Sequence, residues 1–128
     1  MGRVLRLAIG DKMNFNEFQK ECKRTANPDM EWQQANLNWA LGICGEAGEY
    51  SEIIKKDAFH GKVMNLDNVK KELGDVLYYV AMAAENLGVD LGDIAQANVD
   101  KLRKRYPNGF KKGGGIRHAN NDHEDDGN

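Results

Sequence analysis

The chain has 128 residues, of which 41% are hydrophobic and 30% charged, and its formal net charge is −2. This length is enough for one domain with its own core, and the composition is typical of a helix-rich protein in aqueous solution. The near-neutral charge argues against general binding to nucleic acid or to anionic membranes. Cys22 and Cys44 belong to no C-x-x-C pair, so we read them as reduced thiols of a cytoplasmic protein.

The first predicted helix runs from 14 to 26 and follows an N-terminal extension, residues 1–13. Apolar residues of this helix recur at three- and four-residue spacing, which indicates one buried face. Pro28 disfavours a helical conformation at the residue before it and is expected to end the helix. The apolar patch of the extension is too short for a signal peptide or a membrane span.

The second predicted helix runs from 31 to 58, and Gly61 is expected to cap its C-terminal end. Within it the sequence GEAGEYSEIIKK places Glu46 and Glu49 three residues apart, on one side of the helix. Glycines occur at 42, 45 and 48, although each costs up to about 1 kcal/mol relative to alanine within a helix. Their clustering predicts that another helix or a ligand approaches this segment closely.

The third predicted helix begins near Asn65 or Asp67, either of which is a good N-cap, and ends at Leu87 before a glycine. Two stripes run along it. The apolar stripe, which we expect to be the core face, holds Val69, Leu73, Val76, Val80, Ala83 and Leu87. The adjoining stripe holds Glu72, Asp75, Tyr79 and Met82.

The fourth predicted helix starts after Asp90 and ends before Pro107, which cannot continue it. No alternating stretch typical of a β-strand is present, so the predicted fold class is all-α, resembling a four-helix bundle. The predicted helices occupy a single domain, residues 14–110. The remaining segment, 111–128, is rich in glycine and then polar and acidic, and its low apolar content predicts disorder.

The two acid pairs predict a metal site if the second and third helices pack antiparallel across their short connection. Glu46 and Glu49 would then approach Glu72 and Asp75. Two unit charges 4 Å apart repel by about 4 kcal/mol at an effective dielectric constant of 20, a large part of the stability of a domain. A cation would neutralise this repulsion. Oxygen ligands without histidine or cysteine favour a hard ion, Mg²⁺ first and Mn²⁺ second.

The same motifs resemble those of the MazG-like all-α nucleoside triphosphate pyrophosphohydrolases. The hallmark of that family is E-x-x-E followed, after a spacer of about twenty residues, by E-x-x-D; this chain has both, with 22 residues between them. The resemblance extends from residue 32 to 110 and includes KELGDVLYY and KLRKRYP in the expected order.

This resemblance implies Mg²⁺-dependent hydrolysis of nucleoside triphosphates to monophosphate and pyrophosphate, in nucleotide pool control or house-cleaning, by a homodimer or homotetramer. It implies that Glu46, Glu49, Glu72 and Asp75 are the metal ligands. Many relatives carry an acid directly before the first motif glutamate, where this chain has Gly45. Glu46 and Glu49 are the carboxylates that can accept the proton of the attacking water in its place.

Candidates for contact with the nucleotide come from three helices. Asn98, Lys101 and Arg105 share one face of the fourth predicted helix, where the resemblance implies phosphate contacts, and Arg105 can bind phosphate oxygens through two N–H groups. Lys56 is a further candidate for phosphate, and Trp39 and Tyr79 are candidates for the base or sugar. For each of these side chains, a place in the core or on the solvated surface is the competing interpretation.

Three other functions compete with hydrolysis. The main alternative is a non-catalytic, metal-binding helical module for dimerisation or partner binding. A di-iron carboxylate protein is disfavoured because the E-x-x-H ligand pairs of such bundles are absent. Nucleic-acid binding through residues 101–112 has real basic residues in its favour, but the acidic tail and the net charge weaken it.

Overall fold

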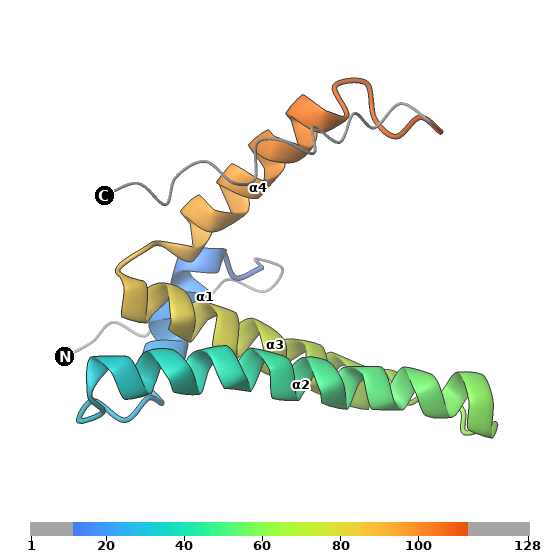
Figure 1. Cartoon of the computed structure of the whole chain (residues 1–128), viewed down its shortest axis with the longest axis horizontal. Helices are drawn as coiled ribbons and strands as arrows, with labels where there is room; N and C mark the ends of the chain where they lie inside the picture. The colour runs from blue at the N-terminus through green and yellow to red at the C-terminus, as the bar shows by residue number, and fades with distance from the viewer. Residues whose placement is uncertain (1–11, 113–128) are drawn as a thin grey trace. The chain divides into compact units, whose positions relative to one another are not determined.

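The computed structural model describes residues 12–112, and within this range it contains four α-helices and no β-strand (Figure 1). The helices are α1 (Phe15–Lys23), α2 (Trp32–His60), α3 (Leu66–Leu87) and α4 (Leu91–Arg105). The predicted all-α class is confirmed. The chain divides after Gly92 into two compact units, the first with α1 to α3 and the second with most of α4. Most of the predicted N-terminal extension and of the predicted tail lies outside the described residues.

The ends of α2 and α3 follow from local chemistry. Gly61 ends α2 with φ 61°, the left-handed conformation that glycine adopts most easily. The Asn65 side chain accepts hydrogen bonds from the backbone N–H groups of Asp67 (2.9 Å) and Asn68 (3.4 Å) and so begins α3. The connection between the two caps is short, and α2 and α3 therefore run antiparallel and pack against each other.

The register of α2 against α3 is regular. Each step of three or four residues toward the start of α2 is matched by an equal step toward the end of α3. Residues that meet in this way are Glu46 with Asp75, Gly42 with Tyr79, and Trp39 with Met82. This register brings the acid motifs of the two helices to the same level.

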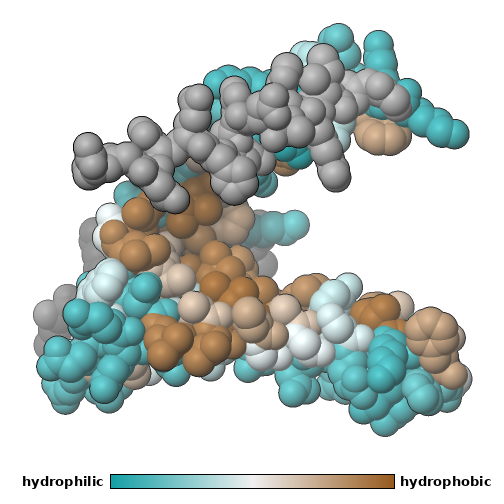
Figure 2. Space-filling view, in the orientation of Figure 1, coloured by the Kyte–Doolittle hydropathy of each residue, from teal (hydrophilic) through white to brown (hydrophobic). Residues whose placement is uncertain are grey.

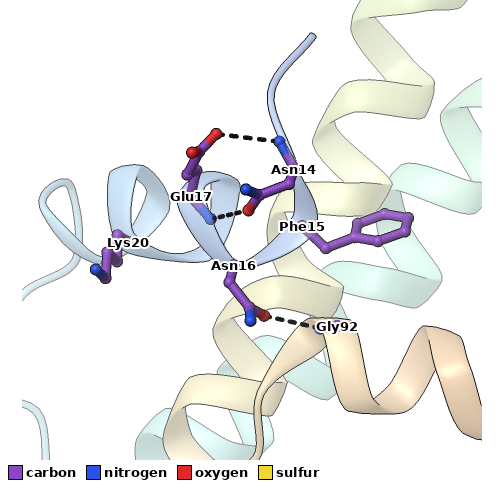
Figure 3. A pocket seen from close by; sticks show the side chains of 6 residues that line it. All are labelled: Asn14, Phe15, Asn16, Glu17, Lys20 and Gly92. Carbon is purple, nitrogen blue, oxygen red and sulfur yellow. Dashed lines mark hydrogen bonds between the residues drawn. The ribbon is translucent and has the colours of Figure 1, made fainter. Parts of the chain in front are cut away.

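Helix α1 begins with a capping box and ends earlier than predicted. The Asn14 side chain accepts a hydrogen bond from the Glu17 N–H (2.9 Å), and the Glu17 carboxylate accepts one from the Asn14 N–H (3.2 Å; Figure 3). The helix ends at Lys23 rather than at residue 26. Thr25 Oγ1 donates to the Cys22 carbonyl (2.8 Å), so the chain turns before it reaches the proline.

Side chains of α1 also cap the first turn of α4, whose N–H groups lack partners within the helix. Asn16 Oδ1 accepts a hydrogen bond from the Gly92 N–H (2.9 Å; Figure 3), and Gln19 Oε1 accepts one from the Leu91 N–H (2.7 Å). The buried Gln19 amide also donates to the Val89 carbonyl and the Glu85 carboxylate, both at 3.0 Å. Every polar atom of this buried side chain is therefore satisfied.

The core lies where α1 and α2 meet the C-terminal half of α3. Its buried residues are Cys22, Ala35, Trp39, Ala81, Met82 and Leu91. The apolar stripe predicted as the core face of α3 is wrong in part, because Leu73 is 47% and Leu87 57% exposed. Met82, from the stripe that carries the acids, is only 3% exposed, because that stripe turns toward α2.

An exposed apolar surface therefore remains on the α2–α3 pair. Its large side chains include Leu37 and Leu41 on α2, at 60% and 61% exposure, and Leu73 and Leu77 on α3, at 47% and 37%. Figure 2 shows apolar side chains gathered over the left-hand part of this helix pair. None of the helices in residues 12–112 combines the length and the apolar character that a membrane crossing requires.

Candidate metal centre

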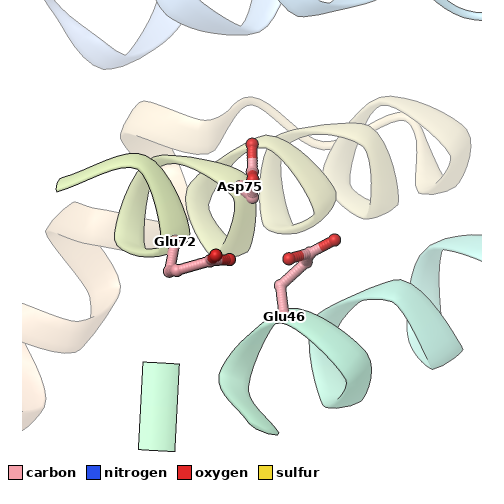
Figure 4. A group of neighbouring side chains, drawn as sticks. All are labelled: Glu46, Glu72 and Asp75. Atoms are coloured by element: carbon pink, nitrogen blue, oxygen red, sulfur yellow. The ribbon is translucent and has the colours of Figure 1, made fainter. Parts of the chain in front are cut away.

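Three carboxylates from two helices converge in the middle of the α2–α3 pair. Glu46 projects from α2 toward Glu72 and Asp75, which lie one turn apart on α3 (Figure 4). One oxygen atom from each of the three side chains lies within 4.8 Å of the other two. Glu46 and Glu72 are half-buried and Asp75 is exposed, so the group opens to solvent on one side.

The electrostatics of this group appear in the pKa of Glu46. Partial burial raises the pKa of its carboxyl, and the charge of Asp75 raises it further. A hydrogen bond with Glu72 and the charges of Glu72 and Glu49 act in the same direction. Crowded carboxylates disfavour simultaneous ionisation, so without a cation the Glu46 carboxyl keeps its proton to higher pH than an isolated glutamate.

The donor set fits a hard divalent cation. All three residues offer carboxylate oxygen atoms, and Mg²⁺ binds oxygen at about 2.0–2.1 Å, so opposite ligand atoms around one ion are about 4.2 Å apart. The observed spread of up to 4.8 Å is close to this span. Glu46, Glu72 and Asp75 could therefore hold such an ion with small rotations of their side chains, leaving further positions for substrate oxygens or water.

Glu49, the fourth predicted ligand, does not belong to this group of three. Three residues turn an α-helix by about 300°, so Glu49 points about 60° away from Glu46 and one turn closer to the end of α2. Its side chain is exposed, yet its charge still contributes to the raised pKa of Glu46. Its position is thus next to the converged group rather than within it.

The predicted close approach to the glycines of α2 is confirmed at one position. A Cβ atom on Gly42 would overlap the ring of Tyr79, whereas a Cβ on Gly45 or Gly48 would meet no atom within 4 Å. Tyr79, predicted as a nucleotide contact, therefore packs across α2 directly beside the acid level. The ring also lies 6.1 Å from that of Trp39, centroid to centroid.

The other predicted nucleotide contacts lie away from the three carboxylates or in the second unit. Trp39 is only 6% exposed and belongs to the core. Lys56 is paired with Glu52 at 3.3 Å and lies ten residues beyond Glu46, about 15 Å along α2. Asn98 and Lys101 are exposed on α4 and Arg105 is half-buried. Their predicted contact with phosphate stays a prediction.

A family model describes most of the same region. The model of the MazG nucleotide pyrophosphohydrolase domain matches residues 34–110, more than half of the chain and all four motif acids. The chain belongs to the MazG family. MazG domains are all-α, as this chain is, and generally use a divalent metal, which agrees with the carboxylate group described above. Membership also makes this chain a hydrolase of the pyrophosphohydrolase type.

A curated protein is similar to this chain, but its name states no activity. The MazG chain is 39% identical over 79 residues to the gene 37 protein of Mycobacterium phage L5, across 59% of this chain and 69% of the phage protein. No solved structure matches the chain significantly.

A group of residues around the buried Trp39 was not predicted from the sequence. They come from α1, the turn before α2, and the last turns of α3, and they line a cavity next to the core. No periodic signal links such distant segments; the matched register of α2 and α3 could have placed Met82 and Asn86 beside the start of α2.

Proposed function

We propose that this MazG protein hydrolyses nucleoside triphosphates, ribo- or deoxyribo-, between the α and β phosphates, giving a nucleoside monophosphate and pyrophosphate. The observation that carries the proposal is the convergence of Glu46, Glu72 and Asp75 at one level of the α2–α3 pair. Such a group of acids is costly unless a cation neutralises it. Family membership supports a pyrophosphohydrolase reaction, and the biological role we propose is nucleotide pool control or house-cleaning.

Mg²⁺, with Mn²⁺ as a substitute, would supply neutralisation of the triphosphate charge and a fixed orientation of its oxygens. Glu46, Glu72 and Asp75 would hold the ion, with Glu49 completing the set after a change of rotamer. The carboxylates would fix the position of the ion, and alignment of the phosphates on that side of the helix pair before reaction would be the main source of rate.

Water is the nucleophile in the proposed reaction. Its oxygen attacks the α phosphorus, the bond from this phosphorus to the α–β bridging oxygen breaks, and pyrophosphate leaves with the bonding electrons. Glu46 or Glu49 accepts the proton of the water, and an exposed carboxylate such as Glu49 can return it to solvent. Asn98, Lys101 and Arg105 on α4, with Lys56 on α2, are the side chains we propose for contact with the phosphates.

We further propose that the chain acts as a homodimer or homotetramer. The apolar surface that includes Leu37, Leu41, Leu73 and Leu77 supports this. Large apolar side chains that a single chain leaves exposed are often covered when chains associate. A second copy of the chain would bury side chains such as Leu73, which belongs to the predicted α3 core stripe and is exposed in one chain.

Product analysis tests the proposed reaction. Purified protein is incubated with each common ribo- and deoxyribonucleoside triphosphate, with and without Mg²⁺, and the products are separated by anion-exchange chromatography. We expect monophosphate and pyrophosphate in equal amounts, and only with the metal. Glu49→Gln is expected to lose at least 100-fold in rate while keeping its helical circular dichroism, because it removes a charge without changing the shape of the side chain.

Glu21→Gln is the matched control, since Glu21 is an exposed acid of α1 that pairs with Arg24 and has no proposed part in catalysis or binding. It should keep the wild-type rate. Wild-type activity in Glu49→Gln, or release of orthophosphate in place of pyrophosphate, would contradict the proposed reaction.

A further inference from the structure

A cavity of about 280 Å³ lies beside the core, at the end of the α2–α3 pair that is remote from their connection. Its apolar residues include Met30, Trp39 and Met82, of which Trp39 and Met82 are almost completely buried. The volume is near the lower limit of ordinary small-molecule pockets, about 300–1,000 Å³. An aromatic, apolar pocket of this size suits one flat heterocyclic ring system.

The polar groups at the cavity come from three segments. Lys23 Nζ lies 2.8 Å from the Glu85 carboxylate, and both side chains line the cavity. Two amides, Asn27 and Asn86, line it as well. A pocket with an apolar floor and a few amide and charged groups can recognise a ring whose edge carries hydrogen-bond donors and acceptors.

The two amides are held by local hydrogen bonds that leave part of each side chain for a ligand. Asn27 Oδ1 accepts a hydrogen bond from the Asp29 N–H (3.0 Å), and Asn86 Nδ2 donates to the Trp32 carbonyl (3.3 Å). Among the interactions of residues 12–112, none uses the Asn27 NH₂ group or the side-chain oxygen Oδ1 of Asn86, whereas the backbone carbonyl of Asn86 accepts a hydrogen bond from Trp32 Nε1 (2.8 Å). One donor and one acceptor are therefore available at the same cavity.

The distance between the cavity and the three carboxylates indicates which ligand the cavity would bind. Trp39 precedes Glu46 by seven residues on α2, and Met82 follows Asp75 by seven residues on α3. Because the helices run antiparallel, both steps lead in the same direction, by about 10 Å at 1.5 Å per residue. This separation matches the reach of a nucleotide from its base to its phosphates.

We infer that this cavity binds the nucleobase of the substrate and that Asn27 and Asn86 read the edge of the base. The inference rests on the proposed function, since the same substrate would span from the cavity to the carboxylate group. Helix α1 and the turn that follows it, which contribute Lys23 and Asn27, then act in the choice of substrate.

Binding of reaction products tests the inference without hydrolysis. Isothermal titration calorimetry with the full chain and Mg²⁺ compares the four common deoxynucleoside monophosphates with inorganic tripolyphosphate, which has no base. Ala26→Leu fills the cavity with a larger side chain, and Asn86→Ala removes one of the two amides. We expect both variants to weaken binding of the preferred monophosphate at least tenfold and to leave tripolyphosphate binding within twofold of wild type.

Two control variants carry the same chemical changes outside the cavity. Ala40→Leu and Asn38→Ala alter exposed residues of α2 and should bind the monophosphates as the wild type does. Thermal unfolding and circular dichroism establish that each variant is folded. Unchanged monophosphate binding in Ala26→Leu and Asn86→Ala would overturn the inference, as would an equal loss for tripolyphosphate or a wild-type protein that binds no monophosphate.

Failure of the inference differs from failure of the proposed function. If the cavity variants bind monophosphates normally while Glu49→Gln loses pyrophosphate release, the base binds elsewhere and the reaction stands. If the cavity variants lose monophosphate binding but no triphosphate is hydrolysed, the cavity is a nucleotide site and the proposed reaction fails.

Discussion

Glu46 carries the clearest electrostatic sign of the candidate metal centre. Its folded-state pKa is raised by partial burial and by Asp75, Glu72 and Glu49. Between the unfolded and folded pKa values the folded chain therefore binds more protons than the unfolded chain. The free energy of unfolding then decreases as pH rises, because it follows the difference in bound protons between the two states.

This sign predicts the pH dependence of the metal-free protein. The contribution of Glu46 to stability is fully present below the ordinary glutamate pKa of about 4.3. It is lost as pH rises through the raised pKa. Glu46→Gln removes the titration, so we expect the variant to become more stable than the wild type as pH increases, by urea unfolding in the presence of a chelator. A wild type that gains stability over the variant on raising the pH would contradict this account of Glu46.

Some residues of the candidate site could be predicted from the sequence, and others could not. Glu46, Glu72 and Asp75 were predicted as ligands from the spacing of the two acid pairs together with the family resemblance, and the structure brings the three together. The outward turn of Glu49 was not foreseen, because i and i+3 spacing defines one side of a helix only within about 60°. Asn27 and Asn86 gave no signal, since neither belongs to a periodic pattern and 58 positions separate them.

At the level of single helices, caps and breaks were the most predictable features. Gly61, Asn65 and Gly88 lie at the helix ends for which the sequence suggested them. The end of α1 was predicted three residues too late, because the hydrogen bond from Thr25 to the Cys22 carbonyl acts before the proline does. The buried side of α3 was predicted only in part, because the core forms where both α1 and α2 pack against the C-terminal half of α3.

The glycines of α2 give a matched pair of substitutions. Gly42→Ala should destabilise the chain by about 1–3 kcal/mol, because the added methyl group overlaps the Tyr79 ring and forces a shift in a packed contact. Gly45→Ala should stabilise it by about 0.5–1 kcal/mol, because nothing lies within 4 Å of the new atom and alanine favours the helix. Chemical unfolding at constant pH measures both, and a destabilised Gly45→Ala would contradict the open surroundings of that residue.

For the molecule as a whole, the sequence predicted the all-α class and a helical domain, and the chain also divides after Gly92 into two compact units. The hydrogen bonds that the first turn of α4 donates to Asn16 and Gln19 were not predictable, since they link residues more than 70 positions apart. Local helix propensity determines where the helices form. Contacts between side chains that are far apart in the sequence determine which helices are linked to one another.

The exposed apolar surface predicts self-association. We expect the chain to sediment as a dimer or tetramer at micromolar concentration. Leu73→Glu should shift it toward the monomer, because a buried charge without a partner is strongly unfavourable at an apolar contact. Lys71→Glu, which changes an exposed charged residue of the same helix, is the control and should sediment as the wild type does. A wild-type monomer at these concentrations would contradict the proposed assembly.

Binding of Mn²⁺, followed by electron paramagnetic resonance on the full chain, tests most directly whether the converged carboxylates hold a divalent cation. We predict saturable binding that Mg²⁺ competes away, with affinity at least tenfold weaker in Glu72→Gln and unchanged in the neighbouring control Glu52→Gln. Equal affinity in the wild type and in Glu72→Gln would contradict the claim that Glu46, Glu72 and Asp75 form a metal centre.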